Sequence, residues 1–195
     1  MVCVQKYASP LGGILLAADE IGLTGLWFEG GRHFAERLPA THEERETPSL
    51  AAATRWLDIY FAGKVPAFTP PLHPVGSEFR MAVWKLLLAI PYGQTVSYGE
   101  IARRLAARNG RAKTSARAVG GAVGSNEISL VIPCHRVVGA NGSLTGYAGG
   151  IERKTALLKL ERVGMSLSAA PESGNSRQSG NTTSGRHQFA VSLIR

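Results

Sequence analysis

The sequence predicts a small α/β domain followed by a mainly α-helical domain that contains a helix-turn-helix. Three features predict it: short apolar runs separated by glycines near the N-terminus, a cluster of prolines near residue 70, and helical periodicity after that cluster. We place the first domain at 1–75, the second at 76–165 and a low-complexity, disordered tail at 166–195. A chain of 195 residues, 44% of them hydrophobic, has enough apolar side chains for such cores.

The first domain is expected to combine a small antiparallel sheet with one helix. Apolar runs at 14–18 and 23–28 are separated by glycines, as in strands joined by tight turns. The acidic stretch 42–46 is expected to be a surface loop. Residues 50–61 predict an amphipathic helix, whose apolar face comprises Leu50, Ala53, Leu57 and Phe61. Four prolines within nine residues then predict a linker, at Pro66, Pro70, Pro71 and Pro74.

The second domain begins with three predicted helices. Residues 78–90 carry a helical stripe of apolar side chains, namely Phe79, Val83, Leu86, Leu87 and Ile90. Ser97 and Glu100 have the spacing of a capping box, so a helix is expected from there through Ala106. Thr114 or Ser115 can cap a third helix at 116–124. Two short helices joined by a glycine-containing turn form a helix-turn-helix candidate, although spacing alone is a weak signal for DNA binding.

The helix predicted at 116–124 is rich in glycine, and each glycine costs about 1 kcal/mol relative to alanine. Small residues permit close packing of two helices. They also permit close approach to a nucleic acid, because a minor groove only about 6 Å wide admits a nearly bare helix. Arg117, alone among small neighbours, would then project furthest.

Charge is distributed unevenly along the chain. Residues 1–75 have six Lys or Arg against eight Asp or Glu, whereas residues 76–165 have thirteen against five. The basic excess of the second domain indicates either a polyanionic partner or a solubilising basic face.

The composition also sets expectations about the compartment. Two cysteines, Cys3 and Cys134, are too few for a disulfide framework or a four-ligand zinc cluster. No run approaches the roughly 18 apolar residues of a membrane helix. The N-terminus lacks the layout of a secretory signal. We therefore expect a soluble, cytoplasmic protein.

The densest chemistry follows the third helix. Residues 128–132 form an apolar run typical of a strand, and Pro133-Cys134-His135-Arg136 comes directly after it. A free cysteine is usually a buried apolar residue. Here the adjacent His135 and Arg136 favour a reactive thiol, because cationic or proton-accepting neighbours lower a thiol pKa.

A glycine-rich loop and a last helix complete the domain. The loop, 139–150, lacks the Lys-Ser/Thr ending of a phosphate-binding loop, which argues against nucleotide hydrolysis. The helix, 151–163, has an apolar face of Ile151, Leu157, Leu158 and Leu160. Glu161 shares that face, and a buried carboxylate needs a partner. Either a salt bridge or the orientation of a histidine would satisfy it.

These motifs resemble those of the O6-alkylguanine-DNA alkyltransferases, the methylated-DNA–protein-cysteine methyltransferases. The resemblance covers residues 76–164 closely and the first domain loosely through residues 9–12. The matching segments, in the family's order, are Pro133-Cys134-His135-Arg136-Val137-Val138, Ser97-Tyr98-Gly99-Glu100-Ile101-Ala102, Ala116-Arg117-Ala118-Val119-Gly120, Asn126, Gly146-Tyr147-Ala148-Gly149-Gly150, and Leu157-Leu158 with Glu161.

The resemblance implies catalytic roles for five residues. Cys134 is expected to take the alkyl group from the guanine oxygen, once and irreversibly. His135 is expected to withdraw the thiol proton through a water, with Glu161 orienting its ring. Asn126 is expected to bridge the active-site turn and its neighbouring helix. Tyr98 is expected to donate a proton or hydrogen bond to the departing guanine.

The resemblance also implies how DNA is bound. The target base is flipped out of the duplex from the minor-groove side, and Arg117 fills its place in the stack. Tyr147 and the backbone of Ala148 would form the pocket wall, and the Val137 carbonyl would accept from the exocyclic amine. Gly99 and Val123 are also expected at the DNA or base surface. The expected partner is alkylated double-stranded DNA, bound by a monomer that needs no cofactor, metal or obligate protein partner.

Two departures from the family pattern stand out. The family has Asn-Pro where this chain has Asn126-Glu127, so the turn there is expected to be looser or differently capped. The connection 107–115 is longer and more basic than in the family. It is expected either to make extra phosphate contacts or to be a solvated loop. Cys3, His33, His42 and His73 do not match the zinc ligands of some members.

Three other functions remain open from the residues. A non-catalytic, alkyltransferase-like protein would bind lesions without removing the group, but such proteins lack the cysteine that this chain keeps. A helix-turn-helix transcription factor would bind duplexes sequence-selectively without forming a covalent product. A hydrolytic Cys/His enzyme would turn over repeatedly. The sequence does not show a preference among methyl, ethyl and bulkier adducts, nor whether O4-alkylthymine is a substrate.

Overall fold

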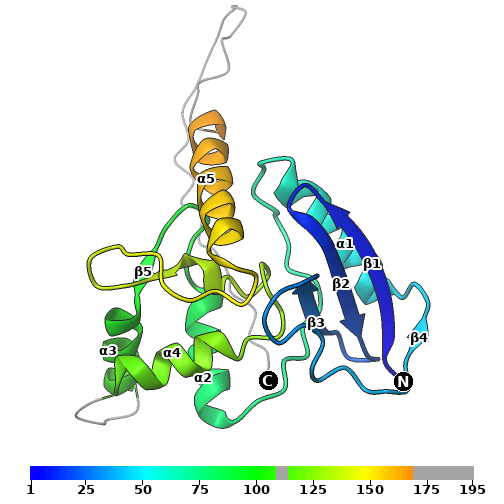
Figure 1. Ribbon diagram of the computed structural model, residues 1–195, viewed down its shortest axis with the longest axis horizontal. Coiled ribbons are helices and arrows are strands. Elements are labelled where there is room, and N and C mark those ends of the chain that lie inside the picture. Colours follow the sequence, from blue (N-terminus) through cyan, green and yellow to red (C-terminus); the bar gives the residue numbers. More distant parts are fainter. Residues whose placement is uncertain (109–113, 169–195) are drawn as a thin grey trace, which may run out of the picture.

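The computed structural model describes residues 1–108 and 114–168, with side chains up to residue 162. The predicted tail lies outside the described residues, apart from the few that extend the last helix, and the connection 107–115 lies partly outside them. The expected fold class is confirmed: a small sheet with one helix is followed by a helical domain. Figure 1 shows the sheet and its helix on one side and the remaining helices on the other.

The N-terminal sheet has four strands in the order β3-β2-β1-β4: β1 Cys3–Ser9, β2 Gly12–Ala18, β3 Leu23–Phe28 and β4 Glu43–Glu44. The first three are antiparallel, joined between β1 and β2 by a turn in which Gly12 has φ +105°. β4 runs parallel to β1, so the sheet is mixed rather than antiparallel. Part of the predicted acidic loop is therefore a strand, because its backbone pairs with the otherwise open edge of β1.

Helix α1, Pro48–Phe61, packs on the sheet. Thr47 caps it by accepting from the amide of Leu50, and proline occupies its first turn, where no intrahelical donor is needed. Leu50, Ala53 and Leu57 are buried as expected. Trp56 and Tyr60 are buried as well, whereas Phe61 is only half-buried. The helix therefore buries a wider face than the sequence predicts, and Tyr60 is part of it.

The proline-rich segment after α1 is an ordered connection that follows the far edge of the sheet. The amide of Leu23 donates to the carbonyl of Pro71, and that of His73 donates to the carbonyl of Leu23. Leu72 pairs with Leu23 in an isolated parallel bridge.

The C-terminal part contains four α-helices within the described residues: α2 Glu78–Leu88, α3 Tyr98–Arg108, α4 Ala116–Gly124 and α5 Ile151–Ser168. Two short strands, β5 Val96–Ser97 and β6 Val137–Val138, pair in parallel, and η1, Cys134–Arg136, is one turn of 3₁₀ helix. No described helix is long and apolar enough to cross a membrane.

Serine caps begin three of these helices, and two details differ from expectation. Ser77, Ser97 and Ser115 accept from backbone amides at the starts of α2, α3 and α4. The capping box at α3 is only half formed, because the Glu100 carboxylate binds Arg103 and Arg104. On α2 the expected Phe79 is 36% exposed, and Trp84 is buried in its place, donating from Nε1 to the carbonyl of Ala122. At the start of α5, Ile151 is likewise exposed.

The predicted strand at 128–132 is wrong. Only Ile128 makes a bridge, to Leu26 of β3, and the chain then turns through Leu130 at φ +68°. Leu26 makes two backbone hydrogen bonds with this segment. Its amide donates to the Glu127 carbonyl, and its carbonyl accepts from the Ser129 amide. The segment is therefore a buried turn attached to β3, and buried side chains of both parts belong to one core.

Candidate active site

A cavity of about 790 Å³ lies between the two parts of the chain. The N-terminal part contributes Trp27 and a basic turn that includes Arg32 and Arg37. The helical part contributes the glycines of α4 and residues around the active-site turn. Of the predicted site residues, the cavity is lined by Tyr98, Val123, Asn126, Cys134, Tyr147 and Ala148.

Cys134 begins η1 and is 4% exposed. Its Sγ atom accepts a hydrogen bond of 3.2 Å from the Nδ2 atom of Asn126. Burial raises the pKa of the Cys134 thiol, against the opposing effects of the Asn126 hydrogen bond and the Lys154 charge. This corrects the expected lowering: desolvation of a buried thiolate outweighs nearby donors and charge. The raised pKa favours the protonated thiol, so a base is needed to remove its proton during any reaction.

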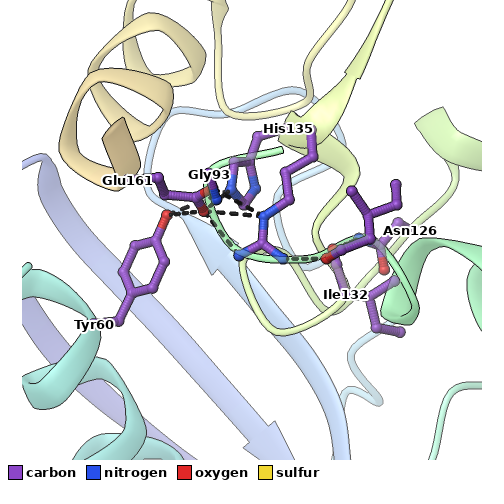
Figure 2. A network of polar contacts seen from close by, with 8 residues as sticks. Tyr60, Gly93, Asn126, Ile132, His135 and Glu161 are labelled. Carbon is purple, nitrogen blue, oxygen red and sulfur yellow. Dashed lines mark hydrogen bonds and ion pairs between the residues drawn. The ribbon is translucent and has the colours of Figure 1, made fainter. Parts of the chain in front are cut away.

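Asn126 organises the turn through one side-chain amide. Its Nδ2 atom also donates to the carbonyls of Ile132 (2.9 Å) and Ile128 (3.3 Å), and its Oδ1 atom accepts from the Ile128 amide (3.1 Å). Figure 2 shows Asn126 and Ile132 near each other, at the end of the network away from Tyr60. Asn126 therefore links the end of α4, the turn and the thiol, as the resemblance implies.

His135 and Glu161 form a buried pair. The Nε2 atom of His135 lies 2.7 Å from Oε1 of Glu161, and both residues are fully buried. Burial lowers the pKa of His135, although the Glu161 carboxylate acts in the opposite direction. Nδ1 of His135 is buried and has no hydrogen-bond partner among the described residues. The hydrogen-bond network thus places the ring proton on Nε2 and leaves Nδ1 free to accept one.

Glu161 accepts from more groups than the sequence predicts. Tyr60 donates its hydroxyl at 2.8 Å, Arg136 donates from Nε and Nη2, and the Gly93 amide donates at 2.9 Å. Figure 2 shows Tyr60, Gly93 and His135 converging on this carboxylate. Burial alone would raise the pKa of Glu161, but the hydrogen bonds and charges of His135 and Arg136 lower it to about 2. The carboxylate is therefore ionised and neutralised by Arg136.

Besides Tyr60, Lys154 is a residue of the site that the sequence did not indicate. It is fully buried, and its Nζ atom donates to the carbonyls of Val137 (2.6 Å), Thr145 (2.9 Å) and Gly146 (3.3 Å). Its ammonium therefore holds the glycine-rich loop against β6. The signal was present, because residue 154 lies three before Leu157 and seven before Glu161, on the same helical face.

The two tyrosines of the site contact different groups. Tyr98, at the start of α3, donates its hydroxyl to the Thr145 carbonyl at 3.2 Å. The ring of Tyr147 lies edge-on to His135, with ring centroids 6.4 Å apart. The carbonyl of Ala148 accepts from the amide of Arg32 at 2.8 Å, which ties the loop to the N-terminal part.

Three expected DNA-side or base-side residues lie outside the cavity lining. Arg117 is exposed in the first turn of α4, and Gly99 is exposed in the first turn of α3. Val137 is buried, and its carbonyl accepts from Lys154. Its expected hydrogen bond to a base would have to share that oxygen.

Comparison with known proteins identifies the family. Residues 78–163 match the 6-O-methylguanine DNA methyltransferase DNA binding domain, and residues 2–74 match the ribonuclease-like domain of the same protein. The chain belongs to the 6-O-methylguanine DNA methyltransferase family. A methylated-DNA–protein-cysteine methyltransferase of Methanosarcina acetivorans is 48% identical over 155 residues, which are 80% of this chain and 95% of the relative. One from Mycobacterium tuberculosis is 43% identical over 162 residues, 83% of this chain and 93% of the relative.

Solved structures of the family agree. The crystal structure of Mycobacterium tuberculosis OGT in complex with DNA matches with a TM-score of 0.71 and 42% identity. The match covers 83% of this chain and 94% of that chain. A structure of an O6-methylguanine DNA methyltransferase from Methanococcus jannaschii matches with a TM-score of 0.59 and 26% identity, over 92% of this chain and all of that one.

The departure from the methyltransferase family pattern at Glu127 has a structural answer. Its carboxylate accepts from Nε1 of Trp27 at 2.6 Å and pairs with Nε of Arg37 at 3.2 Å. The side chain of Glu127 is 14% exposed, and both partners come from the N-terminal part. The turn is thus differently tethered, by polar contacts to the neighbouring domain.

Within the described residues no group of three or more His, Cys, Asp or Glu side chains is placed to hold a metal ion. Cys3 and Cys134 are both buried and free.

Proposed function

We propose that this chain repairs DNA by direct reversal, transferring the alkyl group of O6-alkylguanine to Cys134. Homologues named methylated-DNA–protein-cysteine methyltransferase and a family structure with DNA support DNA repair by alkyl transfer. The observation that carries the proposal is the Cys134 thiol on the cavity wall, held by Asn126 beside a buried His135–Glu161 pair with Nδ1 unengaged.

The proposed reaction is one displacement. His135 accepts the thiol proton at Nδ1 through one water while Sγ attacks the alkyl carbon. The Sγ–C bond forms, the C–O6 bond breaks, and the electron pair leaves with the guanine. Tyr98 turns its hydroxyl hydrogen from the Thr145 carbonyl to the departing base and so stabilises its developing charge. The balance needs no cofactor, and we propose none.

The thioether product contains no bond that water readily cleaves. A second thiol that could remove the group is absent, because the one other cysteine, Cys3, is a residue of β1 whose Sγ accepts from Arg45. Each molecule therefore acts once, as a stoichiometric reagent. This separates the proposal from a hydrolytic Cys/His enzyme, which would turn over.

DNA would be bound on the side of α4. Its first turn presents Arg117, and an added Cβ at Gly121 or Gly124 would meet nothing within 4 Å, which leaves a low, open face. Such a face fits a minor groove, and Arg117 would enter the stack as the alkylated base flips into the cavity. We propose a monomer acting in the cytoplasm on duplex DNA, with O4-alkylthymine as a further substrate.

A non-catalytic lesion-binding protein is the second candidate. It would use the same cavity and the same face of α4 without covalent chemistry. The buried thiol, its amide contact and the adjacent base–carboxylate pair favour transfer over binding alone.

The test is repair stoichiometry. A duplex with one O6-methylguanine is incubated with limiting protein, and repaired DNA is counted per protein molecule. The proposal expects one repair event per molecule for the wild type and for Cys3→Ser, and none for Cys134→Ser. Lesion-selective binding without repair would make the chain a recognition protein, and more than one event per molecule would make it a true catalyst.

A further inference from the structure

The N-terminal part of the chain contributes a tyrosine that binds the carboxylate of Glu161. Tyr60 of α1 is fully buried, and its hydroxyl lies 2.8 Å from Oε1 of Glu161, a residue 101 positions later in the sequence. Figure 2 shows Tyr60 reaching from its helix to Glu161, beside His135. The contact therefore joins the two parts of the chain at the base of the proposed reaction.

The ring of Tyr60 is held on several sides. It stacks on Trp56 at 5.1 Å and 10° and lies edge-on to Phe61 at 5.4 Å. It is also edge-on to Tyr92 at 5.9 Å and to His135 at 6.4 Å. A ring packed in this way cannot swing its hydroxyl away from the carboxylate.

The direction of the hydrogen bond is fixed by charge. An ionised carboxylate only accepts, so the Tyr60 hydroxyl is the donor. Burial and the nearby Glu161 charge raise the pKa of Tyr60 well above its usual value, so the phenol keeps its proton. The Tyr60 oxygen then lies 3.4 Å from Nε2 of His135.

The same carboxylate oxygen of Glu161 therefore binds both Tyr60 and His135. Oε1 of Glu161 accepts from the Tyr60 hydroxyl and from Nε2 of His135. Arg136 also donates to Oε1, and Arg136 and the Gly93 amide donate to Oε2, so without Tyr60 the carboxylate would stay bound but could shift among these donors. The contact between Nε2–H of His135 and Oε1 would then be less well aligned, and the imidazole ring less firmly oriented.

We propose that Tyr60 is a positioning residue for alkyl transfer, whose hydroxyl holds the Glu161 carboxylate against Nε2–H of His135 so that Nδ1 remains the base. This inference rests on the proposed function. In the step, the thiol proton moves from Sγ to Nδ1, the Sγ–C bond forms and the C–O6 bond breaks. Tyr60 keeps its own proton throughout.

A donor on the carboxylate also keeps the proton on the imidazolium. Each donor stabilises the charged form of Glu161 and weakens its attraction for the Nε2 proton. Several titratable or charged groups face His135 and act on it together: Glu161 and Lys154 of α5, Arg136 of η1, Tyr60 of α1 and Tyr147 of the glycine-rich loop.

The test compares Tyr60→Phe with Tyr92→Phe in the full chain. Tyr92 lies in the same aromatic cluster, and its buried hydroxyl has no hydrogen-bond partner among the described residues. Single-turnover rates on a duplex with one O6-methylguanine are measured against pH, together with the affinity for unmodified duplex and the thermal midpoint.

For Tyr60→Phe we expect the plateau rate to fall about tenfold or more, the loss typical of one hydrogen bond to a charged group. The acid limb should also move to higher pH, because a carboxylate with one donor fewer binds the His135 proton more tightly. Duplex affinity should be unchanged, and Tyr92→Phe should match the wild type.

A ring-fluorinated tyrosine at position 60 keeps the test valid if the Phe variant is unstable. It retains the shape and is a stronger donor, so the acid limb should move to lower pH. Unchanged rates and limbs in both variants, or an equal loss in Tyr92→Phe, would overturn the role of Tyr60. Failure of the wild type to transfer at all would instead overturn the proposed function.

Discussion

Nε2 of His135 lies 2.7 Å from Oε1 of Glu161, with both side chains sealed from solvent. The pair joins η1 to α5, and the same carboxylate also binds Arg136, adjacent in sequence to His135. Glu161 therefore orients the proposed base, His135, and neutralises the buried guanidinium of Arg136. Substitutions that disturb these contacts are expected to change both transfer and stability.

Replacing Glu161 by glutamine should abolish transfer and destabilise the fold. The amide leaves Arg136 buried without its charge partner, a change that typically costs about 3–5 kcal/mol. Urea unfolding measures that loss. Glu100→Gln is the matched control, because its ion pairs with Arg103 and Arg104 lie on the surface of α3 and are worth about 0–1 kcal/mol. Equal losses in the two variants would contradict the buried-pair account.

Acidification should lower the stability in two stages. Because burial lowers the pKa of His135 below its usual 6.5, the unfolded chain binds that proton more readily, and stability falls as pH drops below about 6.5. The Glu161 pKa is about 2 instead of 4.5, so its contribution is present above 4.5 and is lost from there towards 2. Urea unfolding at several pH values between 8 and 3 checks both stages. In Glu161→Gln the second stage should shrink, and an unchanged profile would refute the assignment.

Replacing Lys154 by methionine should loosen the wall of the cavity. The Val137 carbonyl loses its donor in a buried place, the Gly146 carbonyl loses a partly buried one, and the Thr145 carbonyl keeps only the Tyr98 hydroxyl. Unpaired buried polar groups cost about 1–3 kcal/mol each in the absence of relaxation. We expect lower stability, faster amide exchange in the loop 139–150 and slower transfer. Lys159→Met, on the exposed side of the same helix, should leave all three unchanged.

The tether at Glu127 should tolerate glutamine better than alanine. Glutamine keeps an acceptor for Nε1 of Trp27 and loses only the pairing with half-exposed Arg37, worth about 0–1 kcal/mol. Alanine leaves the indole N–H of a largely buried Trp27 unpaired and should cost about 1–3 kcal/mol. Unfolding followed by tryptophan fluorescence distinguishes them. If alanine were as stable as glutamine, the Trp27 contact would carry no weight.

Arg117→Ala should separate DNA handling from chemistry. The side chain lies outside the cavity lining and is exposed. If it fills the stack during base flipping, its loss slows transfer from a duplex while transfer from a free alkylated guanine base stays the same. A matched loss on both substrates would place Arg117 in the chemistry instead.

Helix caps and helical faces could be predicted from the sequence because they depend on residues close together in the chain. Ser97 and Ser115 cap helices as the sequence predicts. The helical periodicity that places Glu161 on the buried face of α5 is equally local. The thiol–histidine–arginine motif is contiguous, so its members need no tertiary information to be recognised together.

Long-range features could not be read in this way. β4 forms because β1 offers an open edge, which no local propensity in the acidic stretch records. The run 128–132 turns rather than extends because Asn126 supplies hydrogen bonds that replace a strand partner. No motif within residues 1–75 indicates a chemical role. Tyr60 belongs to the site only because α1 packs against the second part of the chain.

The most direct test of the central claim is peptide mass analysis after reaction with a duplex that carries one O6-methylguanine. The account predicts that the peptide containing Cys134 gains the mass of one methyl in place of one hydrogen, once per molecule, while the peptide containing Cys3 does not change. An unmodified Cys134 in protein that has removed the lesion, or a methyl group on Cys3, would contradict it.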